Sequence, residues 1–420
     1  MNEHHDVVIV GAGHAGVNLA AYLSKGGYQG SVALLSNETI LPYKRPPLSK
    51  GFLLDAEPLE SLPLRTAEYW AASPVDLQLG VEVLEVRPDE QTVVTASGRE
   101  LTYGRLVWAA GGRARSLPLP GATLPGVHQV RTLDDVLALK QELPRASRAV
   151  FVGGGYIGLE TAAAFRGLGL DVTVIEAAGR VLERVTSAEI SEYFHRVHRE
   201  AGVDIRLGAT VKEFTERDGR VASVVLGDGE VPADVVVVGI GLVPNIDILA
   251  AAGASCSNGI EVDELCRTSL PAVSAIGDCT SQLNPYAPDR RMRLESVQNA
   301  NEQAKVVASD LLGRPAASGE VPKFWSDQYH IKLKTAGLIA GHDQMVVRGD
   351  PGSGVFSVLY LSAGRLVAID SVNNPVDFAK GSALIKQRAQ IAPEVLADSA
   401  QPLQETGLPL TAPGARSRVG

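Results

Sequence analysis

The sequence lacks a long apolar run and a paired-cysteine motif. No stretch of about 18 apolar residues occurs in its 420 positions, so no membrane-spanning helix is expected. Its three cysteines, Cys256, Cys266 and Cys279, form neither a CxxC pair nor a zinc-ligand spacing. We therefore expect buried thiols in a reducing cytoplasm and no metal site. The first residues, MNEHHDVVIV, carry no basic leader and begin a strand, so no signal peptide is expected.

An excess of positive charge is also missing. The chain has 39 lysines and arginines against 48 acidic residues, a net charge of −9 at pH 7, which argues against nucleic acid as the main partner. Glycine, in contrast, is abundant, with 43 residues, and suits a fold with many tight turns. The length allows two or three domains and a large buried core.

An internal repeat indicates the fold. Residues 7–23, VVIVGAGHAGVNLAAYL, resemble residues 149–165, AVFVGGGYIGLETAAAF. Each copy is an apolar run, a GxGxxG motif and an alanine-rich helical pattern, and each is followed by a second apolar run. The order strand, glycine turn, helix, strand predicts an α/β fold with two Rossmann-like dinucleotide-binding domains.

The glycines of each motif share three tasks. The first makes the tight turn, the second lets the backbone approach a pyrophosphate, and the third lets helix and strand pack closely. They are Gly11, Gly13 and Gly16 in the first copy and Gly153, Gly155 and Gly158 in the second. A plain glycine turn is the alternative, but two copies in the right context disfavour it.

Acidic residues after the second strand of each unit predict the nucleotide. Glu176 ends the run VTVIE, where a carboxylate accepts ribose hydroxyls and repels a 2′-phosphate, so NADH is expected over NADPH. In the first unit the ribose position falls among Ser36, Asn37 and Glu38. Glu38 is the only acid of the three, and which one binds stays open. Two dinucleotide sites suggest a tightly held flavin and an exchangeable nicotinamide nucleotide.

Glycine-ended strands and one good helix outline the remaining organisation. Strands are expected in 105–115, 234–245 and 272–279, and a helix in 295–313 that stops at Gly313. Short antiparallel strands follow, then a helix around 375–390 and a frayed tail from about residue 401. We predict a first dinucleotide domain in two parts, 1–112 and 243–321, a second at 113–242, and a C-terminal α+β domain at 322–420.

Several motifs in this order resemble one family. The segments GAGHAG, PYKRPPLSK, AAGGRAR, VGGGYIGLE, GIGLVPN, AIGDC, ESVQNANEQA and FWSDQY are similar to those of the FAD-dependent, NADH-linked ferredoxin reductases of bacterial oxygenase systems, such as the putidaredoxin and biphenyl dioxygenase reductases. Apoptosis-inducing factor is a relative. The resemblance implies that the N-terminal glycine turn binds FAD and the middle one NADH.

The resemblance also implies individual cofactor contacts. Asp278 in a GD turn would accept ribityl hydroxyls, and the first turn of the 295–313 helix would stabilise negative charge on the flavin. The implied FAD set is Ala15, Lys50, Val83, Arg131, Asp278 and Val297, with Glu38 and Arg45 added. On the nicotinamide side the predicted set adds Tyr156, which would cover the nicotinamide pocket, together with Ile157, Glu160 and Gly241.

Lys50 and Glu160 form the predicted catalytic pair. By resemblance they meet beside flavin N5, where the ammonium would favour the reduced flavin and the carboxylate would keep the lysine charged and positioned. Without the resemblance, both would be surface charges. The family places Trp325 near the flavin, with a core aromatic as the alternative, and Trp70 is expected to be a packing residue.

The stretch LPYKRPPLSKGFL, residues 41–53, holds three prolines and no cysteine. Pro46 and Pro47 predict a rigid turn rather than a helix, as a wall of the flavin site that ends in Lys50. Disulfide reductases of the same architecture carry a reactive cysteine in this region. Its absence predicts that no disulfide is the substrate and that electrons leave the flavin directly.

The predicted function is electron transfer from NADH through FAD to an acidic 2Fe-2S ferredoxin that feeds an oxygenase. A local basic face would then be needed on this acidic chain, with candidates Arg290, Arg291, Arg293, Lys332, Lys334, Lys386 and Arg388. Two alternatives stay open. One is reduction of a small acceptor, such as a quinone or the monodehydroascorbate radical, and the other is a redox-gated interaction protein.

Overall fold

The computed structural model describes residues 3–403. The chain divides into two compact units, the first ending at Lys332 and the second beginning at Leu333. No helix in residues 3–403 is long and apolar enough to cross a membrane. The predicted three-domain division, with boundaries at 112, 242 and 321, stays a prediction.

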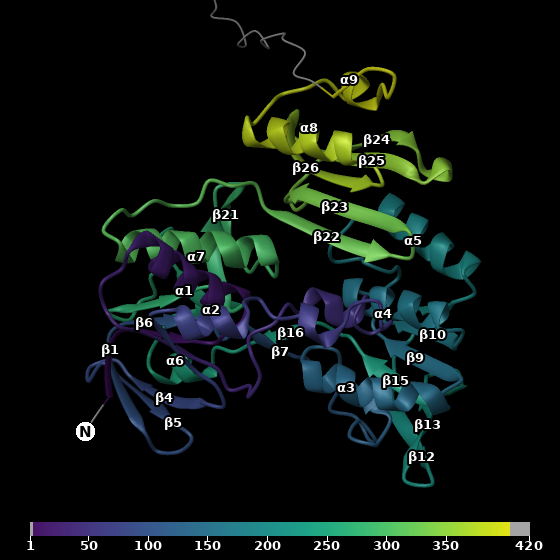
Figure 1. The fold of residues 1–420 in the computed structure, drawn as a ribbon. Helices are drawn as coiled ribbons and strands as arrows, with labels where there is room; N and C mark the ends of the chain where they lie inside the picture. Colours follow the sequence, from purple (N-terminus) through teal and green to yellow (C-terminus); the bar gives the residue numbers. More distant parts are fainter. Residues whose placement is uncertain (1–2, 404–420) are drawn as a thin grey trace, which may run out of the picture. The chain divides into compact units, whose positions relative to one another are not determined.

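The first unit begins with a seven-stranded sheet. Five strands run parallel, and their central residues are buried because helices and loops cover both faces. Val7 and Ile9 face the core cluster with helices α1 (His14–Gly26) and α7 (Val297–Leu311), which lie side by side (Figure 1). The sheet order is β3 (Val75–Gln78), β2 (Val32–Leu35), β1 (Glu3–Val10), β6 (Glu100–Trp108), β5 (Thr92–Thr95) and β4 (Val83–Arg87), with β19 (Val273–Ala275) on β6.

A second sheet of five parallel strands holds the second glycine motif. Helix α4 (Tyr156–Gly167) follows its strand β9, as α1 follows β1, so both predicted units fold as strand, turn, helix and strand. Helices α3 (Leu133–Glu142) and α5 (Ala188–Glu200) belong to the same segment. The order is β11 (Asp204–Leu207), β10 (Asp171–Glu176), β9 (Arg148–Val152), β15 (Val235–Val238) and β8 (Val127–His128).

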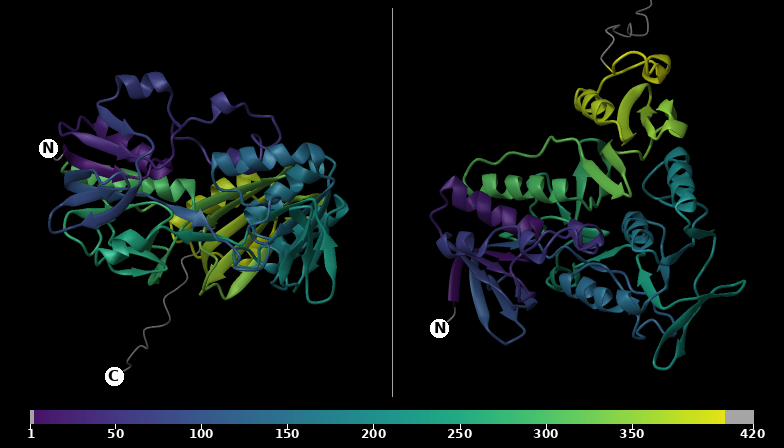
Figure 2. Two further views of the ribbon diagram at one scale, coloured as in Figure 1. Left: turned by 90° about the horizontal axis from the view of Figure 1, so that it is seen from below. Right: turned by 45° about the vertical axis from the view of Figure 1, so that its right-hand side comes forward.

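Two short antiparallel strands connect the sheets. The chain leaves the first sheet through β7 (Gly112–Ala114) and returns through β16 (Leu242–Pro244), and these two pair with each other. An antiparallel sheet of β12 (Glu213–Arg217), β13 (Arg220–Val225) and β14 (Glu230–Pro232) projects from the middle segment (Figure 2). Further along come α6 (Asp247–Ala251), β17 (Cys256–Ser257), β18 (Gly259–Val262), β20 (Thr280–Asn284), β21 (Ala287–Met292) and β22 (Lys323–Gln328).

The second unit contains antiparallel strands, as the sequence predicted. They lie in the order β23 (Ile331–Gly337, which belongs to this unit from Leu333 on), β26 (Arg365–Val372), β25 (Val355–Ser362) and β24 (Gln344–Asp350). Helix α8 (Pro375–Lys386) packs on β26, and a short helix, α9 (Pro393–Ala397), follows. The predicted frayed tail lies mostly in residues 404–420, outside the described part of the chain.

Two local predictions were wrong. Pro46–Ser49 forms one turn of 3-10 helix, because proline is tolerated at the first positions of a helix, where no backbone N–H is needed. Cys266 and Cys279 are buried free thiols as expected, but Cys256 is only partly buried. It lies on the two-residue strand β17 and packs against the edge of the core of the first sheet, which leaves it half-buried.

Candidate cofactor and redox site

A cavity of about 220 Å³ lies in the first unit, where the first glycine turn, the proline stretch, the GD turn and the N-terminus of α7 meet. Residues from the second glycine turn and from β22 close another side. The predicted site residues that line it are Gly13, Ala15, Arg45, Lys50, Arg131, Tyr156, Ile157, Glu160, Asp278, Val297 and Trp325. The structure therefore brings together residues that are far apart in the sequence.

The other predicted residues do not line this cavity. Val83 is buried in the core of the first sheet, so only its backbone is available to a ligand. Gly241 follows β15 with a φ of +103°. The full group outside the lining is Gly11, Gly16, Glu38, Val83, Gly153, Gly155, Gly158, Glu176 and Gly241. Their cofactor contacts stay predictions.

The glycine turns leave room at their middle positions. Gly11 has a φ of +107°, and a Cβ there would overlap the carbonyl oxygen of Ala109. At Gly13 and Gly155, in contrast, no described atom lies within 4 Å of where a Cβ would be. The first glycine is thus required by the protein itself, whereas the middle glycines border open space. This arrangement fits a dinucleotide whose pyrophosphate approaches the backbone.

Two guanidinium groups line the cavity near the first turn. Arg45 donates to Glu38 Oε1 at 2.6 Å and to the carbonyl of Arg131 at 2.8 Å. The Tyr43 hydroxyl donates to the other oxygen of Glu38, also at 2.6 Å. Arg131 lies 3.6 Å from Asp278. Side chains thus fix both cations, and their charge suits an anionic diphosphate. The carboxylate of Glu38 is used in this network.

Lys50 and Glu160 meet, as the resemblance implied. Lys50 Nζ lies 3.1 Å from Glu160 Oε1 and 3.4 Å from Asp327 Oδ2. The Glu160 side chain is only 6% exposed, and it also accepts hydrogen bonds from Ser49 at 3.0 Å and Ser326 at 2.6 Å. Burial raises the pKa of Glu160, while the charge of Lys50 and these donors oppose that shift.

Aromatic side chains from two elements border the cavity. Tyr156, at the start of α4, packs against Phe324 of β22 with ring centroids 4.5 Å apart. Trp325 is 37% exposed, which does not fit the alternative of a core aromatic. Trp70 is a core residue, as predicted.

Sequence reasoning missed several lining or supporting residues. His14 lines the cavity, and burial together with the nearby Arg45 and Arg131 lowers its pKa to about 4, so it is neutral at pH 7. Its signal was its place inside the GAGHAG turn. Ser49, Glu295 and Phe324 also line the cavity, and Ser326 and Asp327 contact the Lys50–Glu160 pair. The last two lie in FWSDQY, but no local pattern assigns them a partner.

Glu176 supports the second glycine turn. Its Oε2 accepts the backbone N–H of Gly154 at 2.6 Å, and its Oε1 accepts that of Ala178 at 2.7 Å. Each carboxylate oxygen can accept a further hydrogen bond. The arrangement is therefore compatible with ribose binding, which stays a prediction.

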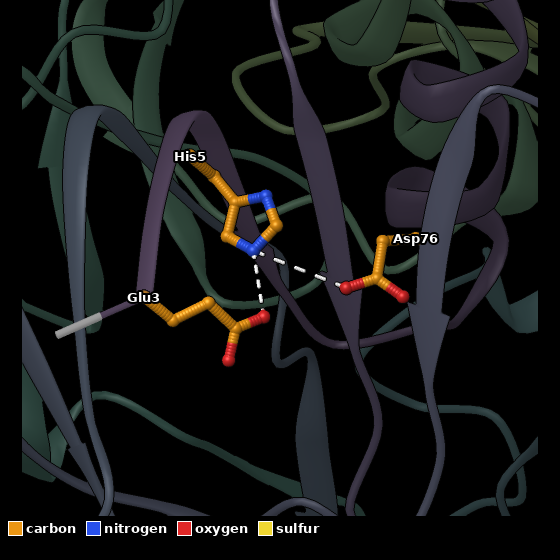
Figure 3. Close-up of side chains that lie close together, drawn as sticks. All are labelled: Glu3, His5 and Asp76. Atoms are coloured by element: carbon orange, nitrogen blue, oxygen red, sulfur yellow. Dashed lines mark hydrogen bonds and ion pairs between the residues drawn. The ribbon is translucent and has the colours of Figure 1, made fainter. Parts of the chain in front are cut away.

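A second group of titratable side chains lies away from the cavity, in Glu3, His5 and Asp76 (Figure 3). His5 Nε2 lies 3.0 Å from Glu3 and 3.9 Å from Asp76. Gln78 donates to both carboxylates, and Arg99 pairs with Glu3 at 3.4 Å. Glu3 and His5 are at the amino end of β1, whereas the glycine turn is at its carboxyl end. Because protein donors already engage these acids, the cluster is best explained as a structural network.

Family models match both parts of the chain. Residues 5–304 match the model described as pyridine nucleotide-disulphide oxidoreductase, and residues 323–407 match the one described as reductase C-terminal. The chain belongs to the pyridine nucleotide-disulphide oxidoreductase family. Membership implies FAD and NAD(P)H, and the open middle glycines and the two cavity arginines fit such dinucleotides.

Relatives within this family narrow the class. A 5,5'-dehydrodivanillate O-demethylase ferredoxin reductase subunit from Sphingobium sp. is 48% identical over 96% of this chain and 98% of its own. Putidaredoxin reductase from Pseudomonas putida is 42% identical over 96% of this chain and 97% of its own. A covalent putidaredoxin reductase–putidaredoxin complex superposes with a TM-score of 0.92, at 42% identity, covering 96% of this chain and 97% of that one. The chain is thus an oxidoreductase of the ferredoxin reductase type, as the sequence predicted.

Proposed function

We propose that this protein passes electrons from NADH, through bound FAD, to a 2Fe-2S ferredoxin that feeds an oxygenase. The observation that carries the proposal is the Lys50–Glu160 ion pair on the wall of a cavity that also contains the first glycine turn. The names of the relatives, which include a ferredoxin reductase subunit of an O-demethylase, support the acceptor. A cytoplasmic location stays a prediction.

The residues of the cavity would hold FAD in a defined direction. Gly13 and the N-terminus of α1 would receive the pyrophosphate, with Arg45 and Arg131 as counter-charges, and Asp278 would accept hydrogen bonds from hydroxyls of the ribityl chain. Helix α7 begins at Val297 on the cavity wall, and its N-terminus would face the isoalloxazine ring. When bound, FAD supplies the redox chemistry: it accepts hydride from NADH and releases electrons one at a time.

Lys50 would carry the positive charge that favours electron-rich flavin. Glu160 pairs with that ammonium and fixes its position, and Asp327 is a second carboxylate partner. Tyr156 and Phe324 pack together on the cavity wall, where they would border the nicotinamide ring. These groups would orient the two cofactors and polarise the flavin. Hydride transfer requires this because it needs close approach of the two rings rather than a proton donor.

The exit of electrons is direct in this proposal. Residues 41–53 contain no cysteine, and the three thiols of the chain are unpaired, two of them fully buried. None of these three thiols lines the cavity, so the proposal includes no thiol relay from the flavin. A flavin without a thiol relay suits a one-electron acceptor that docks near the cavity. A relative, putidaredoxin reductase, has been crystallised in a covalent complex with putidaredoxin.

Part of the predicted basic face has another role. The Arg293 side chain is 10% exposed and pairs with Glu295, so it is not available to a partner. Arg291 donates to the backbone oxygens of Val262 and Ser281. Arg293 is therefore removed from the docking candidates, whereas Arg291, whose side chain is 36% exposed, stays one.

The acceptor is tested by steady-state NADH oxidation coupled to cytochrome c reduction. The purified protein, loaded with FAD, is assayed with and without a 2Fe-2S ferredoxin from the same organism, and separately with a quinone. Strong stimulation by the ferredoxin, decreasing with salt, is expected because oppositely charged faces steer encounter. Stimulation by the quinone alone would contradict the proposal and favour a small-acceptor reductase.

A further inference from the structure

A chain of hydrogen bonds leads from Glu160 into helix α5. Ser326 Oγ lies 2.6 Å from Glu160 Oε1, and Gln328 Nε2 lies 3.1 Å from Ser326 Oγ. Gln328 Oε1 is 2.8 Å from His198 Nε2, and His198 Nδ1 is 3.2 Å from the hydroxyl of Tyr329. Ser326, Gln328 and His198 are fully or almost fully buried. This series of hydrogen bonds therefore connects the predicted catalytic pair, Lys50 and Glu160, with His198, a residue that belongs to none of the sequence motifs.

The direction of this chain follows from the donors available. A serine hydroxyl has one hydrogen, and with Glu160 ionised that hydrogen points to the carboxylate. Ser326 must then accept from the amide nitrogen of Gln328, which turns the amide oxygen towards His198. His198 must therefore carry its hydrogen on Nε2, and its Nδ1 accepts from Tyr329. In each hydrogen bond of the series, the donor is thus the group farther from Glu160 and the acceptor is the group nearer to it.

Reversing the direction of these hydrogen bonds requires three coupled changes. Glu160 would be protonated, the Gln328 amide would be turned over, and His198 would carry its hydrogen on Nδ1 instead. In the structure the Gln328 amide nitrogen faces Ser326, which is the orientation that matches an anionic Glu160 facing Lys50. Burial lowers the pKa of His198 to about 4, so the imidazole is neutral and can both donate and accept at pH 7. A fully satisfied buried chain of this kind fixes one geometry.

We propose that His198 is a positioning residue for the reduction of the flavin, acting through Gln328 and Ser326 to hold the Glu160 carboxylate towards Lys50. This rests on the proposed function of the Lys50–Glu160 pair. Removing the histidine donor frees the Gln328 amide to turn over. Ser326 would then donate to the amide oxygen and no longer to Glu160, and the carboxylate would lose a hydrogen bond that favours its charged form.

The chain orients rather than conducts protons. A proton passing from Tyr329 to Glu160 would have to cross the Gln328 amide, whose nitrogen and oxygen exchange protons only through an unstable imidic form. The role assigned to His198 is therefore to keep the hydrogen bonds in one direction, with the donors pointing towards Glu160. The charged and titratable groups around the chain are Lys50 and Asp327 at the Glu160 end, and His195 and Arg166 at the His198 end.

The test is anaerobic stopped-flow reduction of the FAD-loaded protein by saturating NADH, from pH 5.5 to 9. His198→Leu removes the donor, His198→Gln restores an N–H close to the Nε2 position, and His195→Leu is a matched control on the same helix. We expect His198→Leu to reduce the rate about tenfold at pH 7. We also expect its rising pH limb to move to higher pH, because Glu160 ionises later.

The controls separate this inference from the proposed function. His198→Gln should stay within about twofold of wild type, and His195→Leu should match it. If His198→Leu keeps the wild-type rate and profile while Lys50→Met is slow, the inference is wrong and the proposed function stands. If Lys50→Met is also fast, both are wrong. Should His198→Leu fail to retain FAD, Ser326→Ala removes the donor at Glu160 itself, and an unshifted profile there overturns the inference.

Discussion

The carboxylate of Glu176 accepts the backbone N–H of Gly154 at 2.6 Å, inside the second glycine turn. One side chain thus both shapes the turn and reaches the predicted ribose position. Glu176→Gln keeps an acceptor for the turn but removes the charge that repels a 2′-phosphate. We expect the ratio of kcat/KM for NADH over NADPH to fall about tenfold, with FAD content unchanged. An unchanged ratio would show that Glu176 has only the structural role.

The two middle glycines offer a way to separate the nucleotide sites. A Cβ at Gly13 or Gly155 meets no described atom within 4 Å, and both residues have an ordinary extended backbone, so an alanine at either position leaves the fold intact. Gly13→Ala should lower the FAD content of the purified protein. Gly155→Ala should keep FAD and weaken NADH binding about tenfold or more, because the new methyl group meets the pyrophosphate.

Absorbance at the flavin bands and titration with NADH check this pair of variants. The expected effects are exchanged if the N-terminal turn binds NADH and the middle turn binds FAD. That result would contradict the assignment of the two turns.

The burial of Asp370 leads us to expect that the stability of the second unit depends on pH. Its carboxyl is fully buried, accepting from Thr335 at 2.6 Å and Tyr360 at 2.7 Å, and burial raises its pKa to about 6. Because the folded state binds this proton more tightly than the unfolded state, the group favours folding below about pH 3.8. That contribution is lost as the pH rises through 6.

Asp370→Asn removes this titration. Relative to the variant, the wild-type protein should lose about 2 kcal/mol of unfolding free energy between pH 4 and pH 7.5. Urea unfolding of both proteins at several pH values measures the difference. A difference that does not vary with pH would mean that the carboxyl titrates normally despite its burial.

Local patterns predicted the fold well. The glycine motifs, the helix over 295–313 and the antiparallel C-terminal strands all have signals within short windows, namely apolar periodicity, turn glycines and caps. The 3-10 turn at Pro46–Ser49 was missed because proline excludes helix interiors but not first turns.

Less of the candidate site could be predicted from the sequence alone. Lys50 and Glu160 were paired only through the family resemblance, since nothing local indicates that a lysine after a proline stretch meets a glutamate of another sheet. Ser326, Asp327 and His198 were not predicted at all. Their roles depend on packing of β22 against α4 and on its hydrogen bonds to α5, contacts between segments that are distant in the sequence.

The central claim is that Lys50, held by Glu160, promotes reduction of the flavin by NADH. Its most direct test is single-turnover reduction of the FAD-loaded Lys50→Met variant, followed anaerobically at saturating NADH. Lys44→Met is the matched control, because Lys44 lies in the same stretch but is exposed and donates to the carbonyl of Ser61. We predict a rate at least about tenfold lower for Lys50→Met, with a lower flavin potential, and a wild-type rate for Lys44→Met. A Lys50→Met variant that retains FAD and is reduced at the wild-type rate would contradict the account.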